Sequence, residues 1–314
     1  MKFATYIHAG KRQSGVIADD RAHPFERPVD LLALIMEGKD SLCRAGERAL
    51  TGSLPVPLAD VRLLPPLQPP TVRDYMTFES HVAGVARGYG DTVPDEWYAA
   101  PAFYFTNPYA VIGAHDDVPM PPGCLRFDFE LEVAAVIGKA GRDLTPEQAH
   151  EHIIGYTILN DWSARDLQGR EMKVKLGPAK GKDTATTLGP WLVTADELEP
   201  HRNTEGFLDL ALSVAVNGET VGRDRLANMA WTFEEMAAYA SRGTWIRPGD
   251  VLGSGTCGNG GCLAELWGRN GDLRPPPLTP GDTVTMAVEG IGTLKNTVTE
   301  GVPPIPLPPA RLRQ

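Results

Sequence analysis

The sequence predicts an α+β fold that is rich in β-strands, with a small β-rich N-terminal domain over residues 1–68 and a larger domain over residues 69–314. Three observations support this prediction. Short apolar runs recur between glycine and proline turns, few segments have helical periodicity, and six prolines interrupt residues 55–70. This pattern is typical of a barrel or rolled sheet and does not fit a regular βαβ alternation.

The N-terminal segment begins with a predicted hairpin. Residues 1–20 alternate in the manner of paired strands, with turn signals at residues 10–12 and 19–20. Residues 30–38 predict a short helix that Asp30 caps and Gly38 ends. The prolines that follow cannot lie inside a helix, so we place the domain boundary among them.

The larger domain has few predicted helices. Residues 145–153 and 232–242 are two of them, whereas residues 208–221, 250–256 and 281–299 predict strands. The proline-rich segment 303–309 is expected to be extended and peripheral.

Composition excludes several classes of protein. The chain has 314 residues, 42% of them hydrophobic and 22% charged, as in an ordinary globular protein. Its formal net charge of −10 argues against nucleic acid or an anionic membrane as a partner. Neither a membrane span nor a signal peptide is apparent, and the four cysteines have no C-x-x-C spacing. We therefore expect a cytoplasmic protein with free thiols.

The acidic stretch at residues 128–132 is the most informative feature. In a regular strand Asp128, Glu130 and Glu132 share one face, and the apolar run after them predicts a buried strand. Asp161 ends another apolar run and can supply a further carboxylate. One interpretation is an edge strand with a hydrated acidic face, and the other is a site for a hard divalent cation. The second acidic element favours the cation.

Other polar residues near apolar runs are candidates for catalysis. Asp74 and His81 lie seven positions apart, and Glu265 lies inside an apolar run, where it needs a partner. A pair of His81 and Glu265 would satisfy both groups and orient the imidazole as a general base. The alternative for His81 is a surface histidine, and the alternative for Lys182 is a solvated loop lysine.

Two apparent motifs are rejected. Residues 253–258 match G-x-G-x-x-G, but the glycines after them leave no room for the helix that a dinucleotide site requires. Serine hydrolase and zinc protease motifs are missing from the sequence. Cys257 and Cys262 are interpreted as packing residues.

Taken together, these motifs resemble those of the fumarylacetoacetate hydrolase family over nearly all of residues 70–300. The order and spacing of the matching elements are specific, although each element alone is weak. The matching elements are Asp74 with His81, D-F-E-L-E at 128–132, G-Y-T-I-L-N-D-W-S-A-R-D-L-Q at 155–168, G-K-D-T-A-T-T-L-G-P at 181–190, G-S-G-T at 253–256 and L-A-E-L-W at 263–267.

The resemblance implies the family's mixed β-roll domain behind a small β-rich N-terminal domain, and it implies roles for individual residues. Catalysis falls on His81, Glu265, Lys182, Arg165 and Gln168. The metal ligands fall on Asp74, Glu130, Glu132 and Asp161, and substrate contacts fall on Tyr104, Thr186 and Thr256. The implied cofactor is a divalent cation, Mg²⁺ first, with Ca²⁺ and Mn²⁺ as alternatives.

The implied activity is hydrolysis of a carbon–carbon bond in an acylpyruvate or 1,3-diketo acid, and the implied partner is a small keto acid. The alternatives are a decarboxylase, an isomerase or a 2-keto-3-deoxy sugar-acid dehydratase of the same fold, and a non-catalytic calcium-binding protein. Met76 departs from the tyrosine of the fumarylacetoacetate-cleaving members, and no arginine aligns well after His81. The resemblance also implies a homodimer, for which residues 231–239 offer an apolar face.

Overall fold

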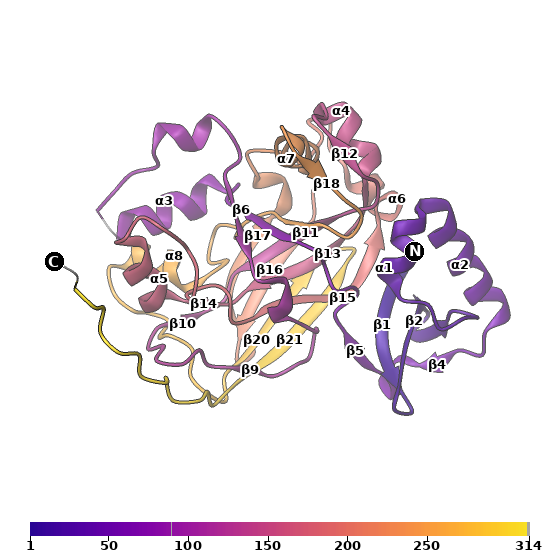
Figure 1. Ribbon diagram of the computed structural model, residues 1–314, viewed down its shortest axis with the longest axis horizontal. Helices are drawn as coiled ribbons and strands as arrows, with labels where there is room; N and C mark the ends of the chain where they lie inside the picture. The colour runs from indigo at the N-terminus through magenta and orange to yellow at the C-terminus, as the bar shows by residue number, and fades with distance from the viewer. Residues whose placement is uncertain (89, 313–314) are drawn as a thin grey trace.

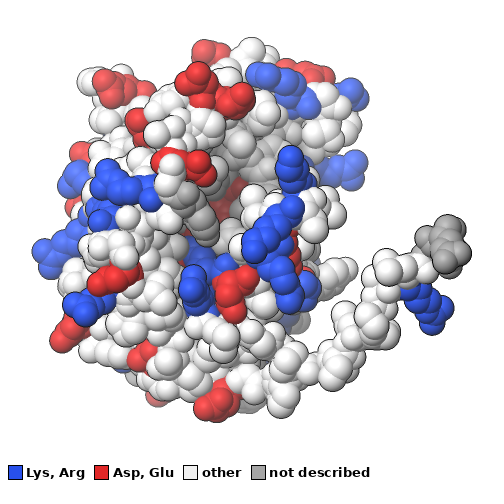
Figure 2. Space-filling model, turned by 90° about the vertical axis from the view of Figure 1, so that its left-hand side faces the viewer, with Lys and Arg blue, Asp and Glu red and all other residues white. Residues whose placement is uncertain are grey.

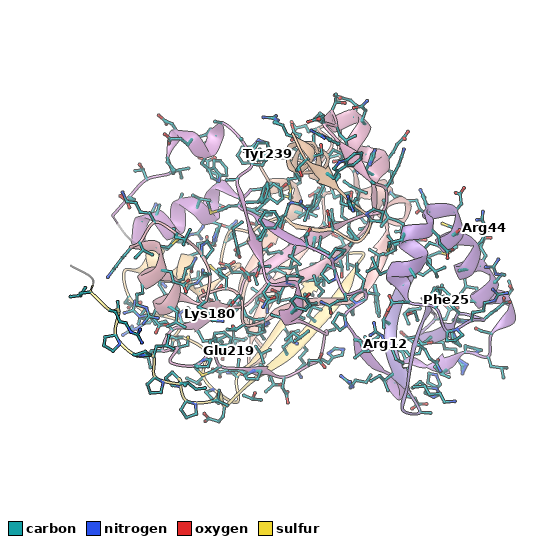
Figure 3. The ribbon with its side chains drawn as sticks, in the orientation of Figure 1. Arg12, Phe25, Arg44, Lys180, Glu219 and Tyr239 are labelled. Atoms are coloured by element: carbon teal, nitrogen blue, oxygen red, sulfur yellow. The ribbon has the colours of Figure 1, made fainter. Side chains whose placement is uncertain are left out.

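A computed structural model describes residues 1–88 and 90–312 of the chain. The N-terminal elements lie at one end of the molecule and the helices α3, α5 and α8 lie at the other (Figure 1). The labelled side chains of Arg12, Phe25 and Arg44 are correspondingly distant from Lys180, which lies in the loop after α5 (Figure 3). No helix of the described residues is both long and apolar enough to cross a membrane.

The main sheet joins the two ends of the molecule. Its ten strands on the hydrogen-bonded path are, in order, β4 (Val56–Pro57), β3 (Arg21–Pro24), β2 (Lys11–Ala18), β1 (Lys2–His8), β15 (Thr186–Thr194), β13 (Ile153–Asp161), β11 (Leu131–Ile137), β19 (Val251–Gly253), β6 (Val72–Tyr75) and β7 (Phe103–Thr106). Two strands pair outside this path, β5 (Arg62–Leu64) with β1 and β8 (Val111–Ile112) with β15. Because β1 pairs antiparallel with β15, the N-terminal hairpin belongs to the same sheet as the larger region.

Smaller sheets complete the β-structure of the described residues. A five-stranded sheet has the order β17 (Glu219–Arg225), β16 (Ala211–Val216), β20 (Thr283–Val288), β21 (Gly292–Thr299) and β9 (Val118–Pro119). Two strand pairs are β10 (Phe127–Asp128) with β14 (Ser163–Ala164), and β12 (Gly141–Arg142) with β18 (Trp245–Ile246). This β-rich mixed architecture confirms the predicted fold class.

The helices are more numerous than the sequence predicted. The described helices are α1 (Leu31–Glu37), α2 (Lys39–Gly52), α3 (Glu79–Gly88), α4 (Pro146–Ala149), α5 (Arg165–Met172), α6 (Ala195–Leu198), α7 (Phe233–Ser241) and α8 (Leu263–Asn270). Asp30 caps α1 through its side chain and Gly38 ends it, as predicted. Capping boxes begin α4 and α7, and α4 is shorter than expected because a 3-10 turn follows it.

The core strands explain the long apolar runs in the sequence. Every residue of β11 and β13 is buried, because one apolar cluster packs on each face of the main sheet. A strand that is covered on both faces needs no polar alternation. The carboxylates at the ends of these two strands are therefore held by a rigid, fully hydrogen-bonded backbone.

Helix α7 narrows one expectation. Residues 231–239 were expected to offer an apolar face to a second copy of the chain. Phe233, Met236 and Ala237 are buried in the core of the chain itself, so only the partly buried Trp231, Ala238 and Tyr239 are left to offer such a face. The homodimer and the boundary at residue 68 remain predictions.

Candidate active site

Four buried carboxylates converge where three strands of the main sheet end or begin. Glu130 immediately precedes β11, Glu132 is the second residue of β11, and Asp161 ends β13, whose Asn160 pairs with Leu131. Asp74 lies on β6, which pairs in parallel with β19, and β19 in turn pairs with β11. All four side chains are buried, so the alternative of a hydrated acidic face is wrong.

Two donors lie among these acids. The Lys182 ammonium donates to Glu130 Oε2 and to Asp161 Oδ2, the latter at 2.7 Å. The Tyr104 hydroxyl lies within hydrogen-bond reach of Asp74 Oδ2, at 2.9 Å, and closer still to Asp161 Oδ2. Lys182 is only 3% exposed, so the interpretation of a solvated loop lysine is also wrong.

Three carboxylate oxygens remain without a donor. Among the described residues Asp74 Oδ1, Glu132 Oε1 and Asp161 Oδ1 are buried and make no hydrogen bond. One oxygen each of Asp74, Glu130 and Glu132 lies within 4.8 Å of the others. Buried ionised oxygens without partners are costly unless a cation compensates them, and oxygen ligands suit a hard divalent ion. The residues present therefore fit such an ion.

The pKa shifts have the same origin. Burial raises the pKa of Asp74 and Glu132 well above the ordinary range, and the neighbouring acids raise it further. Burial also raises the pKa of Asp161. Burial alone would raise the pKa of Glu130, but Lys182 and Arg165 outweigh it and lower that pKa. Without a cation, protonation would compensate part of this acidic cluster.

Asp128 corrects the prediction of a shared acidic face. The strand is interrupted between β10 and β11, so alternation fails and Asp128 turns away from Glu132. Its Oδ1 accepts the backbone N–H groups of Phe129 and Leu263, both at 2.8 Å. Its Oδ2 accepts the N–H of Ala264 at 3.0 Å and Nε of Arg165 at 2.8 Å. Asp128 thus holds the first turn of α8 against Arg165.

Arg165 begins α5 and connects several groups of the site. Besides Asp128, its guanidinium donates to Glu130 Oε1 at 2.6 Å and to Gln168 Oε1 at 3.2 Å. A buried guanidinium with three acceptors is fixed in orientation. The face that carries α3 and α5 is hollowed, with acidic atoms inside the recess and Lys and Arg side chains around it (Figure 2).

His81 and Glu265 are brought together by two helices that the sequence did not predict, α3 and α8. His81 Nδ1 lies 3.9 Å from Glu265 Oε2, which is ion-pair range but too long for a hydrogen bond. Glu265 accepts its hydrogen bonds from the backbone N–H groups of Asn259 and Gly260, and Arg269 forms an ion pair with it. The predicted proximity is confirmed, whereas the role as a base-orienting pair stays a prediction.

The glycine-rich segment 253–261 also corrects an expectation. Helix α8 begins at Leu263, so there is room for a helix after the G-x-G-x-x-G match. Gly255, at φ +80°, instead donates its N–H to Glu132 Oε2 at 3.0 Å. A side chain at Gly255 would overlap the carbonyl of Tyr75. The glycines therefore allow backbone to approach the acidic cluster, and no βαβ nucleotide unit surrounds them in the described residues.

The predicted substrate contacts lie beside the acids. Thr186 pairs in register with Asp161, and its buried Oγ1 has no partner among the described residues. Thr256 is buried in the glycine-rich segment. Sequence reasoning missed two features of the site. The first is that Asp128 anchors α8, and the second is the thiol of Cys262, whose Sγ lies 3.7 Å from His81 Nδ1. The position of Asp128, two residues before Glu130, indicated that it lies near the site. The break in the strand that turns its side chain toward α8 has no sign in the sequence.

Two family models together match most of the chain. The model described as Fumarylacetoacetate (FAA) hydrolase C-terminal matches residues 71–299. The model described as Rv2993c-like, N-terminal matches residues 1–66.

Individual proteins are similar over most of their length. Protein Rv2993c of Mycobacterium tuberculosis is 35% identical over 77% of this chain and 80% of its own length. The human mitochondrial oxaloacetate tautomerase FAHD2A is 31% identical over 86% of this chain and 80% of its own length. The structure of a fumarylacetoacetate hydrolase from Exiguobacterium antarcticum has a TM-score of 0.75 and 28% identity, covering 96% of this chain and 99% of that chain.

Proposed function

This chain belongs to the fumarylacetoacetate hydrolase family, and from that premise we propose that it is a metal-dependent hydrolase of ketonic substrates. The substrate class is an acylpyruvate or 1,3-diketo acid similar to fumarylacetoacetate or fumarylpyruvate, cleaved at a carbon–carbon bond. One observation carries the proposal. Asp74, Glu132 and Asp161 each have a buried carboxylate oxygen without a hydrogen-bond donor, and Lys182 lies next to these acids. The likeness to the Exiguobacterium hydrolase agrees with this assignment.

Asp74, Glu130, Glu132 and Asp161 are the residues that would hold the divalent cation. We propose Mg²⁺, with Mn²⁺ and Ca²⁺ as alternatives, because all four side chains offer hard oxygen donors. When bound, the cation supplies Lewis-acid polarisation of the keto-acid oxygens. In this arrangement all four carboxylates would stay ionised.

His81 would act as the general base on water. It removes a proton from water, and the resulting hydroxide attacks the carbonyl carbon remote from the pyruvate end of the substrate. The bond between the attacked carbon and the neighbouring carbon then breaks, and its electron pair leaves with the pyruvate fragment as an enolate. Protonation of that enolate at carbon completes the reaction. Glu265, whose Oε2 lies 3.9 Å from His81 Nδ1, would help to position the imidazole.

Lys182, Arg165 and Gln168 would stabilise the developing negative charge. Lys182 and Arg165 are already held in place by carboxylates, so little reorganisation is needed during the reaction. Donors of this kind contribute about 3 kcal/mol each to a transition state. Tyr104 and Thr186 lie beside the acids, and Thr256 follows Gly255, whose N–H binds Glu132; these three residues would contact the substrate.

A tautomerase or isomerase is the second candidate. The human relative named oxaloacetate tautomerase supports it. Such a reaction moves a proton between carbon and oxygen and needs no attacking water. Decarboxylation and dehydration of a 2-keto-3-deoxy sugar acid use related enolate chemistry. A non-catalytic calcium-binding protein is disfavoured, because calcium binding by the carboxylates alone gives no reason for a buried histidine and a buried lysine, His81 and Lys182, beside them.

Product analysis separates these candidates. The Mg²⁺-loaded protein is incubated with an acylpyruvate in ¹⁸O-labelled water, and in parallel with enol oxaloacetate. Hydrolysis predicts pyruvate and a second acid that carries ¹⁸O, and excess chelator should abolish the activity until Mg²⁺ is restored. Accelerated ketonisation of oxaloacetate without acylpyruvate cleavage would contradict the hydrolase and support the tautomerase. Full activity after chelation and dialysis would contradict the metal dependence.

A further inference from the structure

A second group of metal-binding side chains lies beside the carboxylates. His81, Cys262 and Glu130 are all buried, and one ligand atom from each lies within 4.8 Å of the others. His81 Nδ1 and Cys262 Sγ lie 3.7 Å apart. His81 comes from α3, Cys262 immediately precedes α8 and Glu130 precedes β11, so three separate elements converge here.

This distance suits a tetrahedral zinc site. Zinc binds imidazole nitrogen at about 2.0–2.1 Å and thiolate sulfur at about 2.3 Å. With a tetrahedral angle between them, these bonds place nitrogen and sulfur about 3.5 Å apart. The observed 3.7 Å requires an adjustment of only a few tenths of an ångström. A carboxylate as third ligand and water as fourth would complete the coordination.

The donor types separate this group from the acidic cluster. Asp74 and Glu132 offer oxygen alone, which suits Mg²⁺, whereas sulfur and imidazole nitrogen favour Zn²⁺ and similar softer ions. Arg165 and Lys182 already bind Glu130, and each of these two cations also pairs with a second carboxylate, Asp128 and Asp161 respectively.

We propose that His81 and Cys262, with Glu130 as third ligand, form a binding site for Zn²⁺ or a similarly soft divalent cation. On binding, the Cys262 thiol releases its proton to solvent as the sulfur–metal bond forms. This site is distinct from the carboxylate site in its donors, although Glu130 contributes to both. One consequence rests on the proposed function: Zn²⁺ engages His81, so it inhibits the Mg²⁺-loaded enzyme.

The test uses Co²⁺ as a spectroscopic probe of the Mg²⁺-saturated full-length protein. Co²⁺ should produce a thiolate charge-transfer absorption in the near ultraviolet, saturating at one equivalent and abolished by Zn²⁺. The absorption should be absent in Cys262→Ser and retained in Cys257→Ser, the matched control for another buried cysteine of the same segment. Serine caps a helix well, so Cys262→Ser should fold. A thermal melt like that of the wild type checks this.

Two results would overturn the proposal. One is the same thiolate absorption in Cys262→Ser, and the other is Co²⁺ binding to the wild type without any thiolate absorption. These readouts do not depend on turnover, so failure of the proposed hydrolase leaves them interpretable. Where turnover is measured, Zn²⁺ inhibition should be at least tenfold weaker in Cys262→Ser than in Cys257→Ser. Equal inhibition of the two variants would contradict the inhibitory role.

Discussion

The candidate site has two halves that the fold builds in different ways. The carboxylate half, with Glu132 and Asp161, lies on paired core strands, so backbone hydrogen bonds fix the position of each side chain. The base half, with His81 and Glu265, lies on α3 and α8, which depend on side-chain packing. Because the supports differ, a substitution that disturbs one half need not disturb the other.

Asp128 connects the two halves. Its carboxylate accepts two N–H groups at the start of α8 and also binds Arg165, which reaches Glu130. The carboxylate half would therefore tolerate changes on α3 and α8 better than it tolerates the loss of this anchor. Substitutions in each half and at the anchor test this comparison.

The largest effect is expected for His81→Ala. Loss of a general base lowers kcat by about 10²–10⁴-fold. Affinity for Mg²⁺ should stay unchanged, because His81 is not among the carboxylate ligands. Steady-state kinetics on an acylpyruvate with Mg²⁺ titration measures both quantities. Glu265→Gln should lose less, and the double variant should be little worse than His81→Ala. Near-wild-type hydrolysis by His81→Ala would contradict the role of His81 as the base, and Lys182 could not replace it because two carboxylates hold its ammonium group in the protonated form.

Asp128→Asn should impair both halves. The amide would place N–H donors against the N–H groups whose hydrogen bonds Asp128 now accepts. Leaving buried donors unpaired costs about 1–3 kcal/mol in the free energy of unfolding. The same loss of positioning corresponds to about tenfold to hundredfold in kcat/KM. Denaturant melts and kinetics measure these changes, with Asp117→Asn, at an exposed position, as control. Wild-type stability in Asp128→Asn would refute the anchoring role.

A smaller effect, confined to the base half, is expected for Gly84→Ala. A methyl group at Gly84 would overlap Cγ of Glu265, so α3 and α8 must move apart. We expect kcat to fall by up to about tenfold, since overpacking costs about 1–3 kcal/mol. Gly169→Ala, on α5, is the matched control because a methyl group there meets nothing within 4 Å. Equal kcat values for the two variants would show that the α3–α8 contact does not position Glu265.

The carboxylate half of the site could be predicted from the sequence more fully than the base half. Glu130, Glu132 and Asp161 end or begin long apolar runs, and buried strands follow directly from such runs. The helix α3 was missed because Gly84 and Gly88 interrupt its apolar residues. These glycines allow the backbone of α3 to lie close to α8, and that contact is seen only in the tertiary structure.

Asp128 shows a second limit of sequence reasoning. Strand alternation placed it with Glu130 and Glu132, and a break of two residues between β10 and β11 turned it toward α8. Whether a strand breaks at Phe129 and Glu130 depends on the hydrogen-bonding and packing partners that the fold offers them, rather than on the intrinsic strand propensities of the two residues. The pairing of His81 with Glu265 came from the family resemblance, because residues 184 positions apart carry no local signal.

Direct binding of Mn²⁺ tests the central claim, that the carboxylate half is a cation site independent of the base half. Free Mn²⁺ is measured by electron paramagnetic resonance during titration of the wild type, Glu132→Gln and His81→Ala. We predict one equivalent bound by the wild type, competition by Mg²⁺, at least tenfold weaker binding by Glu132→Gln, and wild-type affinity in His81→Ala. Unchanged affinity in Glu132→Gln, or its loss in His81→Ala, would contradict the account.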